Sequence, residues 1–495
     1  MPSRAWRPRF AVVLALFAVA GCTVAPGAVV VPAPATSTTP PAVQPRAARP
    51  STLGVDSARG SGGVVAAGGR DAPYNYAPTL LREGGTIRMW WCSQLGVAAP
   101  AGDDILLGET ADLRTPFRGP DGTGGQAVFS GSRTGFDGMH TCDPSVVRVG
   151  DTYYLYYTGA AGDHAHGNAI GLATSTDGKR WTRANGGAPI VGSARDELRD
   201  NTYGAGQPAA AFLDGRFYLV FTDTTGAAAG WNGAGQFVLR SPDPTFQTQV
   251  EVLGPDGFAP GVATSPRTRS VVDAFSVDVM WVAPLGAFAI AHQTAGGTSL
   301  TFWDAEFRTQ PHHSVLVPGP WAEGPGLVRD PLGHAPRSDA DPCGRVPVDL
   351  VRATRTRAAP TDLVHFGLDL TGTAACEDPA RVLAALDGYG VPSPQRTIDV
   401  IRGGQVLRVE RRSVAERVAA RVLDHRAPAL AHVPVTAVLP AGAGAVRNGP
   451  HVGFVLDDGR LWALTDPAVA KVNGSTAEEI GPDGWDRYPR GPHLG

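Results

Sequence analysis

The chain has 495 residues, of which 18% are charged, and its formal net charge at pH 7 is −3. This length accommodates one large β domain or two smaller ones. Because the charges nearly balance and form no basic stripe, the sequence gives no reason to expect nucleic acid as a partner. We expect a monomer.

Residues 1–22 have the pattern of a lipoprotein signal peptide. Three arginines precede an apolar segment at 10–20, which is too short to span a bilayer and is typical of a secretory signal. The segment ends in VAGC, which resembles the bacterial lipobox. The resemblance implies that Cys22 carries acyl chains such as palmitate and anchors an exported protein to the outer face of the cell membrane. An ordinary cleaved signal peptide is the alternative.

Residues 23–69 are rich in Ala, Pro, Thr, Val and Gly and contain few charged or aromatic residues. Such a segment cannot bury enough apolar surface to offset the entropy of folding. We therefore predict a disordered tether between the membrane anchor and the folded part of the chain.

A unit of short strands recurs from residue 77 onward. In each copy, a first strand begins near an X-Pro or similar step, and a second strand begins ten residues later. The paired positions are Ala77 and Ile87, Asp143 and Tyr153, Gln207 and Phe217, and Asp278 and Phe288. Short strands repeating at this interval predict an all-β fold, a β-propeller of five blades with loops added to each blade.

The repeat becomes less regular after the fourth copy. We assign blades one to four and the start of blade five to 70–342, and a small α/β insertion with two helical patterns to 343–435. Strands at 436–479 are expected to close the propeller, and 480–495 forms a tail. A separate small domain in the C-terminal third is the alternative.

Four cysteines remain besides Cys22, and export permits disulfides. Three pairings are formally allowed. We favour Cys92 with Cys142, which join blades one and two, and Cys343 with Cys376, which close a loop in the last third. Metal binding is the rival interpretation, but no two of these cysteines have zinc-finger spacing. No cofactor or metal is predicted, and a structural cation on the propeller axis is left open.

The stretch DPSVVRVGDTYYLYYTG, which begins at Asp143, and the later ATSTDGKRW resemble five-bladed propeller glycosidases of glycoside hydrolase family 43 and their sucrose-cleaving relatives. The similarity covers about residues 70 to 310. It implies enzymes that act on arabinose- or xylose-containing glycans. It also implies a base in blade one, a carboxylate in blade two and a Glu acid in blade three, all at the mouth of a central funnel.

The match is incomplete at these positions. Asp143 fits the blade-two carboxylate, but Ala77 stands where the blade-one base is expected, so Asp71 is the nearby candidate. Gln207 stands where the blade-three acid is expected, and an amide cannot donate a proton as an acid.

Two other carboxylates are candidates for the missing acid. Asp278 has the equivalent position in blade four by the spacing above, and Glu323 lies in an EGP triplet like the one that carries the family's acid. We rank Asp278 above Glu323 because so short a triplet arises easily by accident. For Asp143 a turn-capping role is an equal alternative, and for Asp71 and Glu323 a solvated loop carboxylate is favoured.

Five further residues are candidates for substrate binding. Most tryptophans fall on predicted strands, where packing between blades is their usual role, whereas Trp231 lies in a Gly-rich loop. The candidates are Gln207, His140, Trp231, His164 and His166. For the histidines, a structural or solvated role is the alternative.

The leading hypothesis is an envelope-anchored glycoside hydrolase. Its substrate would be a pentose- or furanose-containing polysaccharide of the arabinan or xylan type, cleaved by carboxylate-assisted attack of water. The alternative is a glycan-binding propeller that has lost its acid and base, as Ala77 and Gln207 suggest. A propeller that binds a protein partner instead of sugar is the third class.

Overall fold

The computed structural model describes residues 49–69, 74–94, 102–354 and 361–495. The predicted signal peptide, Cys22, the first part of the tether and Asp71 lie outside the described residues. Strands dominate this part of the chain and helices are few and short, which confirms the all-β class. No helix among the described residues is both long and apolar enough to cross a membrane.

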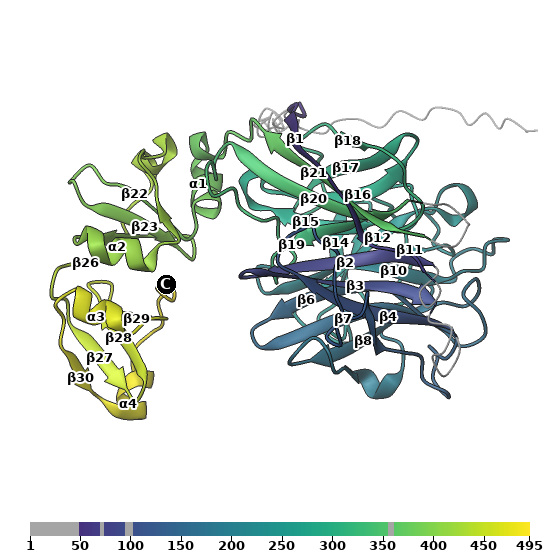
Figure 1. Cartoon of the computed structure of the whole chain (residues 1–495), viewed down its shortest axis with the longest axis horizontal. Coiled ribbons are helices and arrows are strands. Elements are labelled where there is room, and N and C mark those ends of the chain that lie inside the picture. The colour runs from purple at the N-terminus through teal and green to yellow at the C-terminus, as the bar shows by residue number, and fades with distance from the viewer. Residues whose placement is uncertain (1–48, 70–73, 95–101, 355–360) are drawn as a thin grey trace, which may run out of the picture. The chain divides into compact units, whose positions relative to one another are not determined.

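Five antiparallel sheet units make up most of the chain between residues 54 and 371, and their strands lie side by side in Figure 1. Unit 1 consists of β2 (Asn75–Glu83), β3 (Thr86–Gln94), β4 (Asp103–Thr110) and β5 (Gln126–Phe129). Unit 2 consists of β6 (His140–Val149), β7 (Thr152–Ala160), β8 (Ala169–Ser175) and β9 (Thr182–Arg183). Unit 3 consists of β10 (Ala205–Leu213), β11 (Arg216–Asp223), β12 (Gln236–Ser241), β13 (Glu251–Gly254) and β14 (Gly257–Pro260).

The remaining two units complete this part. Unit 4 consists of β15 (Asp278–Val282), β16 (Ala287–Thr294), β17 (Gly297–Asp304) and β18 (Val315–Pro318). Unit 5 consists of β19 (Gly326–Arg329), β20 (Arg345–Ala353), β21 (Leu363–Thr371) and β1 (Gly54–Ala66). The 3-10 turn η1 (Asn185–Gly187) lies in the connection between units 2 and 3, whereas η2 (Trp231–Gly233) and η3 (Ala283–Leu285) lie in connections within units 3 and 4.

Strand β1 corrects two predictions. It pairs antiparallel with β21 and forms the edge strand of unit 5. Residues 54–66 therefore belong to the fold and not to the tether. The strands at 436–479, which were predicted to close the fifth blade, pair only among themselves and with other C-terminal strands in the described chain. The N-terminal strand takes their place because its backbone groups complete the free edge of β21.

The first strands of the five units follow one another in a closed order. β2 packs against β6, β6 against β10, β10 against β15, and β15 against β19. Strand β19 then pairs in parallel with β2, so the order returns to its start. All five first strands thus surround a common centre.

Five equivalent steps, in or just before the first strands, meet at this centre. Four of them are X-Pro steps, and in unit 4 Val277 takes the place of the proline. Each step has a residue with positive φ, and these residues are Ala77 (43°), Asp143 (46°), Gln207 (52°), Ser276 (49°) and Gly324 (56°). In β2, β6 and β10 the step is a β-bulge, where pairing skips two residues. Left-handed backbone is costly for residues other than glycine, so the surrounding strands must enforce it. The fourth position is therefore Ser276, two residues before the predicted Asp278.

A buried arginine connects the first strands. The Arg329 guanidinium on β19 donates to Thr79 Oγ1 on β2 (2.7 Å), Val146 O on β6 (3.4 Å), Ala210 O on β10 (2.9 Å) and Val279 O on β15 (2.9 Å). Its Nη1 also lies 3.1 Å from Asp278 Oδ1. One side chain thus bonds to a first strand of every other unit. We call Asp278 and Arg329 the axial pair.

Residues 375–495 form two sheets with the same topology. The first has the strand order β25-β22-β23-β24-β26 and the second β30-β27-β28-β29. In each, a three-strand meander leads through a helix, α2 or α3, to a strand that pairs in parallel with the first strand of the meander. Side chains from both sheets and both helices share one hydrophobic core. This internal repeat was not predicted from the sequence.

The elements of this C-terminal part are as follows. The first repeat includes β22 (Tyr389–Pro392), β23 (Ile398–Arg402), β24 (Gln405–Val409), α2 (Arg412–Val418), β25 (Arg421–Val422) and β26 (Ala437–Leu439). The second includes β27 (Ala445–Asn448), β28 (His451–Val455), β29 (Leu461–Ala463), α3 (Ala468–Val472) and β30 (Ala477–Glu479). The other helical segments are η4 (Ala375–Glu377), α1 (Pro379–Ala385), η5 (Pro428–His432) and α4 (Gly481–Asp486). The predicted insertion therefore begins later than residue 343, because β20 and β21 belong to unit 5.

Both favoured disulfides are confirmed. Cys92 on β3 bonds to Cys142 on β6, and Cys343 bonds to Cys376. The first links units 1 and 2. It also lies directly beside the polar groups described next.

Candidate active site

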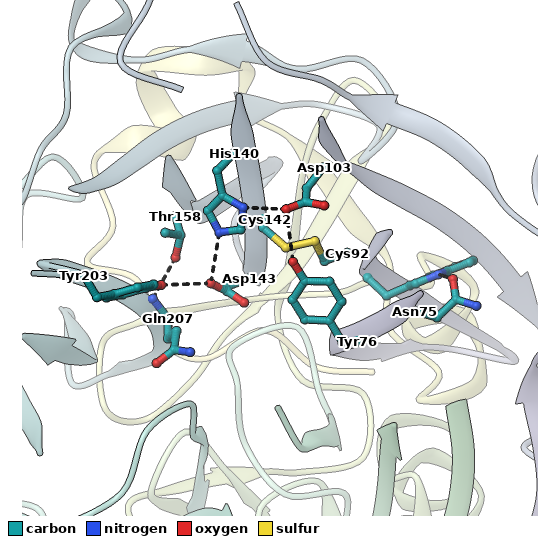
Figure 2. Close-up of a disulfide and its surroundings, with 11 residues drawn as sticks. Asn75, Tyr76, Cys92, Asp103, His140, Cys142, Asp143, Thr158, Tyr203 and Gln207 are labelled. Atoms are coloured by element: carbon teal, nitrogen blue, oxygen red, sulfur yellow. Dashed lines mark hydrogen bonds and ion pairs between the residues drawn. A yellow bond between two sulfur atoms is a disulfide. The ribbon is translucent and has the colours of Figure 1, made fainter. Parts of the chain in front are cut away.

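A buried histidine connects two carboxylates at the junction of units 1 and 2. His140 begins β6, and its Nδ1 lies 2.6 Å from Asp103 Oδ2 at the start of β4. Its Nε2 lies 3.9 Å from Asp143 Oδ2. Figure 2 shows the imidazole between the two carboxylates, with the Cys92–Cys142 disulfide alongside.

The two carboxylates make His140 a cation. Burial by itself would lower the pKa of this imidazole, but its hydrogen bonds to Asp103 and Asp143 and their negative charges raise the pKa to about 9. At neutral pH the cluster therefore contains an imidazolium between two acidic side chains.

Two tyrosines complete the hydrogen bonds of these carboxylates. The Tyr76 hydroxyl donates to Asp103 Oδ2 (3.2 Å), and the Tyr203 hydroxyl donates to Asp143 Oδ2 (3.4 Å). All of these bonds are made by Oδ2. The Oδ1 atoms of Asp103 and Asp143 are buried and have no hydrogen-bond partner among the described residues. Each carboxylate thus keeps one acceptor oxygen for another molecule.

Glu323 is the candidate acid of this site. It precedes β19 and is half-buried. Burial and then the charge of Asp143 raise its pKa to about 7, against the opposing effects of His140 and of a hydrogen bond from Tyr74. A carboxylic acid with this pKa is substantially protonated at neutral pH, so it can donate a proton. We call Asp103, His140, Asp143 and Glu323 the acidic cluster.

A cavity of about 510 Å³ gives access to Glu323. We call it the mouth pocket. Its lining includes the side chains of His164, Asn201, Tyr203, Gln207, Asn232, Phe275, Ser276, Gln293 and Glu323. Gln207 and Ser276 also line a second, much smaller cavity of about 10 Å³, which is formed by the five steps and by Asp278. The mouth pocket therefore lies over the centre that the first strands surround.

The predicted catalytic residues take different places. Asp143 and Glu323 are brought together, as the effect of one on the pKa of the other shows. Asp278 is not part of this group: its oxygens accept from the backbone N–H groups of Val279 (2.9 Å) and Leu327 (2.7 Å), and it pairs with Arg329. Asp278 does not hold the position equivalent to Asp143, because the step of unit 4 lies at Ser276, two residues earlier than the spacing indicated. Asp71 lies outside the described residues.

Only some of the predicted substrate-binding residues line the mouth pocket. Gln207 and His164 line the mouth pocket, although Gln207 Oε1 already accepts from Thr222 Oγ1 (2.9 Å) and Ser276 N (3.0 Å). His140 lies beneath, inside the acidic cluster. His166 is exposed and lies 2.8 Å from Asp163 Oδ1 in the same loop. Trp231 is 87% exposed and directly precedes Asn232 of the pocket lining.

Sequence reasoning missed Asp103, Tyr76 and Tyr203. Asp103 lies on the third strand of its unit, whereas the prediction searched only first strands. The acidic doublet at Asp103 and Asp104 before the apolar run ILLG was a usable signal, since acidic side chains at a buried strand end are uncommon. Burial raises the pKa of Asp104 to about 6.

Two groups of residues in the described chain have metal-like geometry, and each contains a cysteine. They are Cys92 with Asp103 and Cys142, and His140 with Cys142 and Asp143. These cysteines form the disulfide, and a disulfide sulfur is not a thiolate ligand. Neither group therefore retains three donors, and the site does not fit a metal held by these residues.

No family model and no curated protein matches this chain. Solved structures that are similar include a family 117 glycoside hydrolase from the marine bacterium Zobellia galactanivorans, at 13% identity and a TM-score of 0.42 over 65% of this chain and 91% of that one. The α-L-arabinofuranosidase of Podospora anserina in complex with cellotriose is 13% identical, with a TM-score of 0.39 over 64% and 98%. A protein of unknown function from Dyadobacter fermentans is 12% identical, with a TM-score of 0.41 over 64% and 99%. None of the three is described as a family 43 enzyme, and the argument for function rests on the site itself.

Proposed function

We propose that this protein is a glycoside hydrolase whose mouth pocket binds the sugar at the scissile bond. The proposal rests on the Glu323 carboxyl, whose pKa is raised to about 7, and on its acidic neighbour Asp143. The Oδ1 atom of Asp143 has no hydrogen-bond partner among the described residues. Glycosidases need such a pair, one carboxylic acid that is protonated and one carboxylate that is ionised.

The two residues have complementary roles in this reaction. The Glu323 carboxyl gives its proton to the glycosidic oxygen as the bond from that oxygen to the anomeric carbon breaks. A water molecule forms the new bond to the anomeric carbon and gives its proton to the Asp143 carboxylate. His140 and Tyr203 hold Asp143 Oδ2, which leaves Oδ1 to accept that proton. Proton exchange with solvent then restores both groups.

We also infer the finer architecture that this function requires. The closed order of first strands, the shared axial cavity and the Arg329 contacts support five sheet units arranged as the blades of a β-propeller. In that arrangement β1 from the N-terminal side completes the fifth blade. The substrate class, a neutral pentose- or furanose-containing polysaccharide such as arabinan or xylan, follows from the sequence resemblance and is part of the proposal.

The test uses two variants and two kinds of substrate. Glu323→Gln should lower turnover of unactivated glycan by about 10² to 10⁴-fold. It should retain most activity on aryl glycosides whose leaving group needs no proton. Asp143→Asn should lose activity on both. Wild-type activity should fall as pH rises through about 7, where Glu323 loses its proton.

Asp163→Asn is the matched control, because this exposed carboxylate contacts only its own loop and His166 in the described contacts. Unchanged turnover by Glu323→Gln would contradict the proposal. Saturable glycan binding by the wild type without any product would favour the glycan-binding alternative instead.

We propose, further, that the protein is exported and anchored through a lipid on Cys22. The two disulfides support an oxidising compartment. A Cys22→Ser variant should move from the membrane fraction to the soluble fraction of a bacterial host. Equal membrane association of both forms would contradict the anchor.

A further inference from the structure

The charge around the mouth pocket disfavours anionic ligands. Its lining contains no lysine or arginine among the described residues, and its one acidic side chain is Glu323. Beneath it, the acidic cluster has three carboxyl groups and a single imidazolium. A uronate or sulfated sugar would bring further negative charge without a cation to pair with it. The remaining lining groups include amides, hydroxyls, the Phe275 ring and the imidazole of His164, which suit the hydroxyls of a neutral sugar.

An exposed indole lies next to this pocket in the chain. Trp231 is 87% exposed, whereas Trp90, Trp91 and Trp462 are fully buried. An indole exposed to water does not contribute to folding the free energy that burial of so large an aromatic side chain would give. Trp231 directly precedes Asn232, which lines the mouth pocket, so the exposed indole belongs to the turn that carries one of the pocket's lining residues.

The turn that carries Trp231 is tightly fixed. Gly230 N donates to Ala234 O (2.6 Å), and Asn201 Nδ2 from the neighbouring loop donates to Asn232 O (2.8 Å). Asn232 has a left-handed backbone, with a φ of 55°. A fixed turn holds the indole outward at little further entropic cost when a ligand binds.

We propose that Trp231 forms a subsite for a neutral sugar residue of a longer glycan, beyond the residue that occupies the mouth pocket. This inference rests on the proposed function and narrows its substrate to neutral chains of several sugars. The apolar C–H face of a sugar ring packs on the indole, as an amphipathic ring does. The same platform has no charge to attract an acidic polysaccharide.

The experiment measures binding in the Glu323→Gln background, so that no ligand is consumed. Tryptophan fluorescence and calorimetry would follow titration with arabinan and xylan oligosaccharides of increasing length, with the monosaccharides, and with polygalacturonate. We expect affinity to rise with chain length. Adding Trp231→Ala should weaken binding of the long oligosaccharides by about 10-fold and leave binding of the monosaccharide unchanged. Trp231→Phe should recover part of the loss.

Val262→Ala is the matched control, because Val262 is also an exposed apolar residue, at 59%. It should bind like the parent protein. The inference would be overturned if the Trp231→Ala variant and its parent bound long oligosaccharides with equal affinity. It would also be overturned if polygalacturonate bound as tightly as neutral chains, or if no oligosaccharide bound. Length-dependent binding through Trp231 without hydrolysis by the wild type would refute the hydrolase and leave this subsite standing.

Discussion

The axial pair and the acidic cluster both bring buried charges to the region of the first strands, but their carboxylates differ in how many of their oxygens have partners. Asp278 accepts two backbone N–H bonds and pairs with Arg329, whose guanidinium bonds to four other strands. Within the described part of the chain, Asp103 and Asp143 each keep one buried oxygen without a hydrogen-bond partner. A satisfied buried charge holds strands together, whereas an unsatisfied one is available for binding or chemistry.

This difference separates two carboxylates that look alike in the sequence. Asp143 and Asp278 both occur near the start of a first strand, and both are buried. Their partners distinguish them: an imidazolium and a phenol for Asp143, a guanidinium and two amides for Asp278. Three predictions test whether the distinction holds.

The largest expected effect is on the axial pair. Arg329→Met leaves the Asp278 charge buried without its cation and should lower the free energy of unfolding by about 3 to 5 kcal/mol. Urea unfolding followed by fluorescence would measure it. Asp278→Asn should also destabilise the fold, while the folded variant keeps the turnover of the wild type. If the folded Asp278→Asn variant lost turnover, Asp278 would not have the purely structural role that distinguishes it from Asp143.

The next effect concerns His140 and its dependence on pH. Its pKa in the folded protein, about 9, lies above the ordinary value of 6.5, so its charge stabilises the fold fully below pH 6.5. This contribution, roughly 3 kcal/mol, is lost as pH rises through about 9. Unfolding of the wild type and of His140→Gln between pH 6 and pH 10 would measure it. A constant difference between the two proteins over this range would show that His140 is not the cation we describe.

The smallest effect has the opposite sign. The pKa of Glu323 is raised from 4.5 to about 7, so its ionised form is disfavoured in the fold, and stability declines as pH rises from about 4.5 to 7. Glu323→Gln removes this loss and should stabilise the protein by about 2 kcal/mol at pH 8, after allowance for partial exposure. At pH 4 the variant and the wild type should unfold alike. If Glu323→Gln instead lowered the free energy of unfolding at pH 8, the Glu323 carboxylate would be stabilised by partners in the fold, as Asp278 is.

Much of the fold could be predicted because it follows from local pattern. The tyrosine-rich run at Thr152–Ala160 and its preceding turn at Gly150 specify a hairpin wherever they occur. The ten-residue interval located three of the five steps, and it failed at Ser276 because the first strand of unit 4 begins two residues after its step. The edge strand β1 escaped notice because its Gly- and Ser-rich sequence has no apolar alternation.

The site was less predictable, and particular residues show why. Asp103 reaches His140 across two sheet units, and no local pattern relates positions so far apart in sequence. The raised pKa of Glu323 could not be predicted from the sequence, because it depends on burial and on Asp143, which are properties of packing.

The amino-acid sequence by itself determined the strands, the hairpins, the X-Pro steps and a choice of cysteine pairs, since propensity and turn chemistry act between near neighbours. Only the tertiary structure decided which carboxylates meet, which of them is neutralised by Arg329, and which edge β1 completes. Burial and long-range charge set these outcomes, and both arise when distant strands are brought to one centre.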